Sequence, residues 1–188
     1  NRYLKPGGEE NSVARIALDL ESAGHQVFRF WRASAQWEQA NAPSITLQPF
    51  LMWRNPRVLR ELRELHEREK PDLWLLHNVV PVVSLGVYQL AKELQVPIVQ
   101  WLHNYRPISP SGTLFAGRKS IPADDDWVAF EEIRAGSWNG AFLTAWLSLG
   151  YAWNVFRGHF SSVRAWVAVS EEMKQIFARA GWDQSKLY

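Results

Sequence analysis

The chain has 188 residues, of which 47% are hydrophobic and 21% charged, a composition typical of one globular domain with an apolar core. Its 21 lysines and arginines are scattered among 19 aspartates and glutamates, so the formal net charge of +2 argues against a dedicated nucleic-acid surface. Cysteine is absent, which excludes disulfides and thiolate chemistry and is compatible with a reducing compartment.

The first third of the chain predicts one helix and two strands. Apolar residues spaced i, i+3, i+4 and i+7 predict a helix over residues 9–23, with Gly24 suited to its carboxyl-terminal cap. Residues 26–31 predict a strand, and residues 45–47 predict a second strand that is short and lies at an edge. Residues 1–8 form an opening segment rich in glycine and proline.

The middle of the chain alternates helix and strand with short connections. Pro56 begins a predicted helix that ends near Glu69, and a buried strand is predicted over residues 73–76. A helix over residues 82–94 then leads into an apolar, β-branched strand over residues 96–102. This order predicts an α/β fold: a Rossmann-like, three-layer domain with a mostly parallel sheet.

The last third predicts a polar loop over residues 116–126, a helical stretch over 127–160 and a strand over 164–169. A helix over 170–181 follows, and residues 186–188 look like the start of one more strand. In such a fold a helix with glycines at its amino end normally follows a strand. We therefore expect the first strand of the sheet to be missing, and the chain to be a fragment or the ordered part of a longer polypeptide.

Polar side chains follow two of the predicted strands directly. His103-Asn104-Tyr105-Arg106 comes after the strand over residues 96–102, and His77-Asn78 comes after the strand over residues 73–76. In an open parallel sheet, ligands bind outside the carboxyl ends of the strands, so both segments are expected to line the same rim. The alternative is a loop whose polar groups only cap neighbouring structure.

Gly7 and Gly8 precede the first predicted helix, where glycine lets a ligand approach the backbone and free N–H groups favour an anion. Glu9 partly opposes an anion there, so a tight turn is the alternative. No third ligand follows His77 and His103 at close spacing, and no metal site is expected. A neutral imidazole of His103 suits a hydrogen bond to a ligand hydroxyl instead.

Residues 136–156 carry no formal charge, and their large apolar residues recur along one helical stripe that includes Leu149. An ordinary core helix explains this pattern, although its length approaches that of a membrane span. A third interpretation is an interfacial face that contacts lipid or a lipid-linked substrate, with tryptophan at headgroup depth. The residues expected to make such a peripheral membrane contact are Trp138, Phe142, Trp146 and Trp153.

Short motifs spread along the chain strengthen the site hypothesis when they are taken together. In chain order they are Pro6-Gly7-Gly8-Glu9, Ala23-Gly24-His25-Gln26-Val27, Pro71-Asp72 with His77-Asn78, Val96-Pro97-Ile98-Val99 with His103-Asn104-Tyr105-Arg106, Pro110-Ser111-Gly112, and Val167-Ala168-Val169-Ser170-Glu171. This set resembles the amino-terminal domain of family 4 glycosyltransferases, which are retaining enzymes of the GT-B architecture. The resemblance covers nearly the whole chain, from Tyr3 to Tyr188.

The resemblance implies two Rossmann-like domains that face a cleft. Residues 1–188 would form the amino-terminal, acceptor-side domain, and the carboxy-terminal, donor-binding domain would be absent. Gly7 and Gly8 would face the donor phosphates, and His103 would be the catalytic residue beside the transferred sugar. The remaining cleft residues implied by the resemblance are Glu9, His77, Asn78, Asn104, Tyr105, Arg106, Ser170 and Glu171.

The implied reaction transfers a sugar, with retention, from a nucleotide-sugar to a glycan or lipid-linked acceptor during polysaccharide biosynthesis. It needs no metal or other cofactor, and the fragment alone is expected to be inactive. The implied location is the cytoplasm, at the inner face of the membrane. The alternative from another class is a non-catalytic Rossmann-like module that binds a partner protein or a membrane surface.

Overall fold

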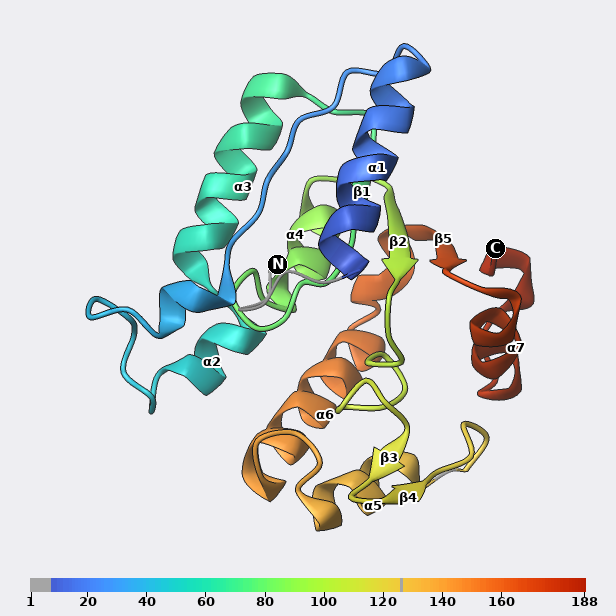
Figure 1. The fold of residues 1–188 in the computed structure, drawn as a ribbon. Helices are drawn as coiled ribbons and strands as arrows, with labels where there is room; N and C mark the ends of the chain where they lie inside the picture. The colour runs from blue at the N-terminus through green and yellow to red at the C-terminus, as the bar shows by residue number, and fades with distance from the viewer. Residues whose placement is uncertain (1–7, 126) are drawn as a thin grey trace.

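The computed structural model describes residues 8–125 and 127–188 (Figure 1). The predicted α/β class is confirmed: the described residues form a three-stranded parallel sheet with helices around it, and a two-stranded antiparallel hairpin. The helices are α1 (Gly8–Ser22), α2 (Gln48–Trp53), α3 (Pro56–Glu69), α4 (Gly86–Glu93), α5 (Val128–Ala135), α6 (Ala141–Phe156) and α7 (Glu171–Arg179). The strands are β1 (Trp74–Leu76), β2 (Ile98–Leu102), β3 (Phe115–Ala116), β4 (Lys119–Ser120) and β5 (Val163–Ala168), and short 3-10 turns are η1 (Ser34–Trp37), η2 (His159–Ser162) and η3 (Gln184–Lys186).

The parallel sheet has the order β1-β2-β5, so β2 is its central strand. In the register of the sheet, Trp74 pairs with Ile98 and Trp101 pairs with Val167. The end of the chain extends the sheet beyond β5, because Leu187 forms a parallel bridge with Trp166. The strand start predicted for residues 186–188 is therefore confirmed at one residue pair.

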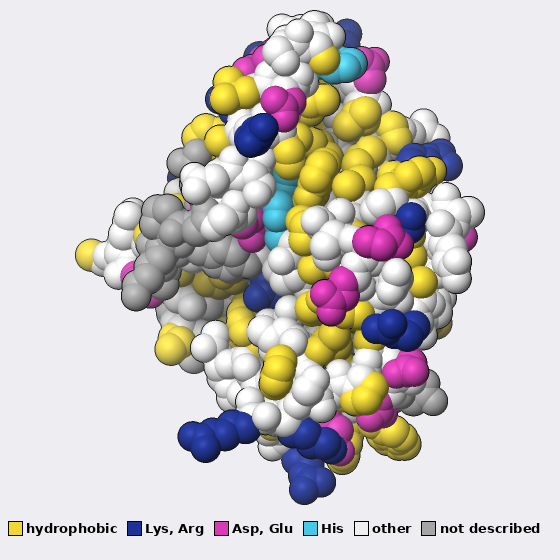
Figure 2. All heavy atoms as spheres, turned by 45° about the vertical axis from the view of Figure 1, so that its right-hand side comes forward, with side chains coloured by type: hydrophobic (Ala, Val, Ile, Leu, Met, Phe, Trp, Pro, Cys, Tyr) yellow, Lys and Arg dark blue, Asp and Glu magenta, His cyan; other side chains and the backbone are white. Residues whose placement is uncertain are grey.

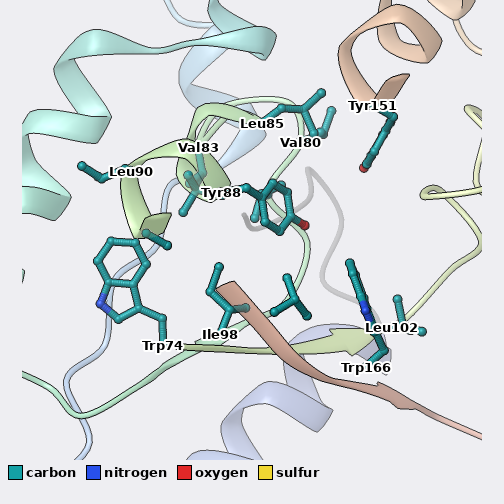
Figure 3. Close-up of a cluster of buried hydrophobic side chains, with 14 of the residues drawn as sticks. Trp74, Val80, Val83, Leu85, Tyr88, Leu90, Ile98, Leu102, Tyr151 and Trp166 are labelled. Carbon is teal, nitrogen blue, oxygen red and sulfur yellow. The ribbon is translucent and has the colours of Figure 1, made fainter. Parts of the chain in front are cut away.

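One face of the sheet holds the main core. Trp74, Ile98 and Trp166 project from the three strands toward α4, where Tyr88 and Leu90 meet them (Figure 3). The side chains of the other face alternate with these and are only half-buried, and α1 lies on that side (Figures 1 and 3). Burial of each large apolar side chain contributes about 1.5–3 kcal/mol, so the face beneath α4 stabilises the sheet most strongly.

Helix α6 packs against α2 at Gly150, where the side chains of Trp53 and Leu85 lie close to the backbone of α6. A Cβ atom on Gly150 would lie 2.7 Å from Leu85 Cδ1 and 2.8 Å from Trp53 Nε1, so the contact depends on glycine. The indole Nε1 atoms of Trp53 and Trp146 donate hydrogen bonds of 2.8 Å to the carbonyl oxygens of Trp146 and Pro49. The inward side of α6 thus belongs to the core, as the first interpretation of this uncharged stretch expected.

The two strands predicted in the first third of the chain are wrong. Residues 26–31 run without regular secondary structure, and their one charged side chain, Arg29, forms a surface ion pair with Glu21 at 2.8 Å instead of facing a strand partner. Residues 45–47 form a turn that leads into α2, and Ile45 is 82% exposed. Alternation of apolar residues identifies an extended segment but not its pairing partner.

Three further boundaries differ from the sequence-based expectation. The helix expected from Val82 begins at Gly86, because Val82 and Ser84 hydrogen-bond Asn55 in a turn. The loop expected over residues 116–126 includes part of the β3–β4 hairpin. The helical stretch expected over residues 127–160 divides into α5, α6 and η2, and positive φ angles at Gly136 and Gly140 separate the two helices. Across the part of the chain that is described, no helix is both long and apolar enough to span a membrane.

Candidate active site

Two histidines meet where β1 and β2 end. His77 directly follows β1, His103 directly follows β2, and the parallel pairing of the two strands brings their carboxyl ends together. The Nδ1 atom of His77 lies 2.9 Å from the Nε2 atom of His103, which is a hydrogen bond between the two rings. Such a bond requires one ring nitrogen to donate and the other to accept. Figure 2 shows histidine surface in a recess between acidic and hydrophobic surface.

Both imidazoles are neutral at physiological pH. Burial, followed by the neighbouring His103, lowers the pKa of His77 from 6.5 to about 3. Burial also lowers the pKa of His103 to about 4, although the nearby Glu10 carboxylate opposes this shift. The Nδ1 atom of His103 has no hydrogen bond to any of the described residues, and a neutral ring can use it toward a ligand hydroxyl.

A buried hydrogen-bond chain supports the pair from below. The Tyr88 hydroxyl donates to Gln100 Oε1 at 2.8 Å, and Gln100 Nε2 donates to the carbonyl oxygen of His77 at 2.7 Å. Burial, and then the neighbouring Tyr151, raises the pKa of Tyr88 well above 10, so its hydroxyl stays protonated as a donor. In Figure 3 the rings of Tyr88 and Tyr151 approach from α4 and α6.

Sequence reasoning missed all three of these supporting residues. Gln100 had a usable signal, because it is a polar residue in the middle of an otherwise apolar strand. Tyr88 and Tyr151 had none, since they lie on helices whose placement over the sheet cannot be read from local spacing.

Arg106 connects the two strand ends. Its side chain is only 8% exposed, and its Nη1 atom donates to Asn78 Oδ1 at 3.1 Å. The backbone N–H of Arg106 donates to Asn104 Oδ1 at 3.0 Å, and its guanidinium carbon lies 5.8 Å from the Trp138 ring centre. The guanidinium therefore places a permanent positive charge beside the histidine pair.

Glu9 lies at the edge of the same group. Burial raises the pKa of the Glu9 carboxyl, while the backbone N–H of Asn78 and the charge of Arg106 oppose the rise. Its Oε1 atom is buried and makes no hydrogen bond to any residue in the described ranges. Gly8 begins α1, and an added Cβ there would meet no described atom within 4 Å. Gly7, the other glycine of the expected phosphate loop, lies outside the described residues.

The loop after His103 is folded tightly onto the site. Gly112 has a φ of 82°, which favours glycine, and a Cβ there would lie 3.3 Å from the Asn104 side chain. The backbone N–H of Tyr105 donates to the carbonyl oxygen of Gly112 at 3.0 Å and closes the loop.

A buried carboxylate fixes the same loop from α5. Glu132 is fully buried, and its Oε1 atom accepts a 2.5 Å hydrogen bond from the Ser109 hydroxyl. Its Oε2 atom accepts a 2.8 Å bond from the backbone N–H of Ser111. These donors replace the water that an exposed carboxylate would bind. In the sequence Glu132 looks like one more charged residue of an amphipathic helix, so its role was missed.

The remaining expected cleft residues lie on the α7 side of the rim. The Tyr105 ring stacks on Phe177 with ring centres 6.1 Å apart, and burial, then Glu172, raises the Tyr105 pKa. Ser170 accepts a 3.2 Å hydrogen bond from the backbone N–H of Met173 and caps α7, as its sequence position predicted. Glu171 is exposed in the first turn of α7.

A small pocket opens at the histidine pair. Its polar lining residues are His77, Asn78, Tyr88, Gln100, His103, Asn104, Arg106 and Tyr151. The pocket thus combines neutral imidazoles, amides, phenol hydroxyls and one guanidinium, a set suited to a ligand rich in hydroxyl groups with a negative charge nearby. Within residues 8–125 and 127–188, no three side chains of the metal-binding types gather in one place.

Comparison with known proteins agrees with the resemblance of the motifs. The sequence model of Glycosyltransferase Family 4 matches residues 6–188. Among curated proteins and among solved structures, neither search found a match to the chain. A glycosyltransferase acts on a sugar donor and an acceptor, which agrees with the polar lining of the pocket. Since the match covers nearly all of the sequence, the chain belongs to glycosyltransferase family 4.

Proposed function

We propose that this chain is the amino-terminal, acceptor-side domain of a retaining GT-B glycosyltransferase that uses a nucleotide-sugar. The observation that carries the proposal is the hydrogen-bonded pair of neutral histidines, His77 and His103, at the carboxyl ends of adjacent parallel strands. This is the position at which open α/β sheets bind their ligands, in a chain of a glycosyltransferase family.

In this proposal His103 hydrogen-bonds a hydroxyl of the transferred sugar through its Nδ1 atom. A pKa of about 4 makes its imidazole a weak base, so the ring suits orientation of the sugar better than removal of a proton. The bond to His77 holds the ring in position, and the chain through Gln100 to Tyr88 fixes His77 in turn. Arg106, Asn78 and Asn104 complete the wall around the sugar.

The retaining step is proposed as front-face substitution. The bond between the sugar C1 and the donor phosphate breaks while the acceptor oxygen bonds to C1 from the same face, and the leaving phosphate takes the acceptor proton. The step requires neither a metal nor another cofactor. Gly7 and Gly8 would face the donor phosphate near the positive amino end of α1. On the family resemblance, the donor nucleotide would be held by a carboxy-terminal domain outside residues 1–188, and these residues alone would be inactive.

The acceptor is proposed to be a glycan or a lipid-linked glycan of polysaccharide biosynthesis, modified in the cytoplasm at the inner face of the membrane. The polar lining of the pocket supports a hydroxyl-rich acceptor or sugar. A hexose is the sugar we expect to be transferred.

The test is release of nucleoside diphosphate from a panel of nucleotide-sugars by the full-length protein, with His103→Ala as the site variant. Loss of the sugar-positioning hydrogen bond is expected to lower kcat by about tenfold to a hundredfold. The matched control is His25→Ala, because His25 is exposed beyond the end of α1. Unchanged turnover in His103→Ala would show that the site assignment is wrong. Release from none of the donors would instead favour the non-catalytic binding module.

A further inference from the structure

Helix α6 exposes large apolar side chains on its outer side. None of its 16 residues is charged. Its inward residues are Thr144, Leu147, Gly150, Tyr151 and Asn154, which are buried. On the opposite side, Phe142 is 67% exposed, Leu149 56%, Trp153 44% and Phe156 80%. We call these last four residues the outer stripe.

The outer stripe is continuous along the helix. Its members are separated by seven, four and three residues, so at 100° per residue they lie on one side. From Phe142 to Phe156 the helix rises about 21 Å at 1.5 Å per residue. An exposed apolar stripe of this length, without a single charge, marks an interaction surface rather than scattered exposed residues.

Helix α2 widens the apolar surface at one end. Phe50 is 57% exposed, and its ring centre lies 5.2 Å from that of Trp146. The Trp146 ring in turn stacks on Phe142 at 6.1 Å, so Phe50 lies beside the amino-terminal part of the outer stripe. Helices α2 and α6 are neighbours in Figure 1.

The composition of this surface differs from the set expected from sequence. Trp146 donates its indole N–H to Pro49 and stacks on Trp53, so it holds α2 and α6 together. Trp138 precedes α6 and lies beside Arg106. Of the four residues expected at a membrane, only Phe142 and Trp153 are exposed.

Basic side chains flank the outer stripe. At its carboxyl-terminal end, the Arg157 guanidinium carbon lies 5.2 Å from the Trp153 ring centre, and Lys92 Nζ donates to the Arg157 carbonyl oxygen at 3.1 Å. The acid nearest to them in sequence, Glu93, pairs with Arg63 at 2.8 Å. Near the amino-terminal end, α5 packs on α6 and carries the exposed Arg134 in its last turn.

We propose that the outer stripe, together with Phe50, docks on the surface of an anionic phospholipid membrane. An uncharged, aromatic-rich helix face with arginine and lysine at its border matches a bilayer interface, where apolar side chains enter the acyl region and basic groups meet phosphates. A second copy of the chain fits less well, because it would bring the same basic borders together. This contact goes beyond the proposed sugar transfer and does not depend on it.

The proposal is tested by co-sedimentation of the full-length protein with vesicles of phosphatidylcholine alone or mixed with phosphatidylglycerol. We expect binding to the mixed vesicles and a loss of about tenfold or more in the combined variant Phe142→Ser, Leu149→Ser, Phe156→Ser. The matched control is the triple variant Leu18→Ser, Leu73→Ser, Val169→Ser, which removes three exposed apolar residues that lie outside α2, α5 and α6.

A second variant tests the charged border separately and does not alter the helix face. Arg157→Gln combined with Lys92→Gln should weaken binding to the mixed vesicles severalfold and reduce its sensitivity to salt. Absence of vesicle binding by the unaltered protein, or equal binding by the Phe142, Leu149 and Phe156 variant, would overturn the proposal. A dimer in light scattering that this variant dissociates, without vesicle binding, would assign the surface to a second copy and also overturn it.

Discussion

At the rim of the sheet, side chains that usually face water are buried, whereas on the outer stripe of α6 side chains that usually are buried face water. Arg106 is 8% exposed and hydrogen-bonded to Asn78, but Phe156 is 80% exposed. Helix α6 takes part in both regions, because its inward Tyr151 lines the pocket. The two regions therefore show that the polarity of a residue does not by itself identify a candidate site. At the rim, the informative feature is the burial of polar groups in fixed positions, and on the outer stripe it is the exposure of apolar area.

The largest difference in the free energy of unfolding is expected between substitutions on the inward side and on the outer side of α6. Leu147→Ala should lower the free energy of unfolding by about 2–5 kcal/mol, because Leu147 is fully buried and its truncation leaves a cavity. Phe156→Ala, on the outer stripe, should change the free energy of unfolding by less than about 0.5 kcal/mol, because the Phe156 side chain is exposed. Urea unfolding of the two variants measures both effects, and a large loss in Phe156→Ala would show that the outer stripe is covered within the chain.

At the rim, Glu132→Ala is expected to cost about 1–3 kcal/mol, because it leaves the Ser109 hydroxyl and the Ser111 backbone N–H without their acceptor. The isosteric Glu132→Gln should recover part of the loss, since one oxygen acceptor remains. Glu131→Ala on the same helix is the control. If all three variants unfolded at the same urea concentration, the loop would not depend on the buried carboxylate.

The last expected effect is the pH dependence that the histidine pair adds to the free energy of unfolding. In the unfolded chain each histidine takes up a proton near pH 6.5, whereas the folded pKa values are about 3 for His77 and about 4 for His103. The stabilising contribution is therefore present above pH 6.5 and is lost as the pH falls toward 4 and then 3. One unit of pKa shift corresponds to about 1.4 kcal/mol, and solvent around the partly exposed rings reduces this, so we expect a loss of a few kcal/mol across this window.

The matched measurement is the difference in unfolding free energy between pH 7 and pH 4.5 for the unaltered protein and for His77→Asn. The variant should show a smaller difference, since one proton-binding group and the bond between the rings are gone. Identical pH profiles would contradict the depressed pKa of His77.

The sequence was sufficient to predict an element where residues at the ends of that element mark its first and last turns. Helix α3 was predicted with the bounds Pro56–Glu69 because Pro56 fits its first turn, and the Asn55 side chain accepts from the Val58 backbone N–H as its cap. The expected strand over residues 26–31 failed because a strand needs a partner, which no local pattern specifies. Gly136 ends α5 in the left-handed conformation that glycine favours at a helix end, a local signal that the prediction of one long helical stretch did not use.

In the candidate site, too, some residues could be predicted from local sequence and others could not. His77 and His103 were predictable, because each follows an apolar run that could only be a buried strand, and parallel pairing then brings the two ends together. Gln100 and Glu132 act through contacts with residues 23 positions away, His77 and Ser109 respectively. Such long-range hydrogen bonds depend on the folded arrangement and leave no spacing rule in the sequence.

The anchoring of the loop by Glu132 divides this segment of the chain into a fixed part and an exposed part. Hydrogen bonds to Ser109 and Ser111 hold the loop before its chain reaches the exposed β3–β4 hairpin. Insertions or new side chains around the exposed Arg118 are therefore expected to leave the loop and His103 in place. The turn of this hairpin is thus a place where the chain can accept inserted residues at little cost to its stability.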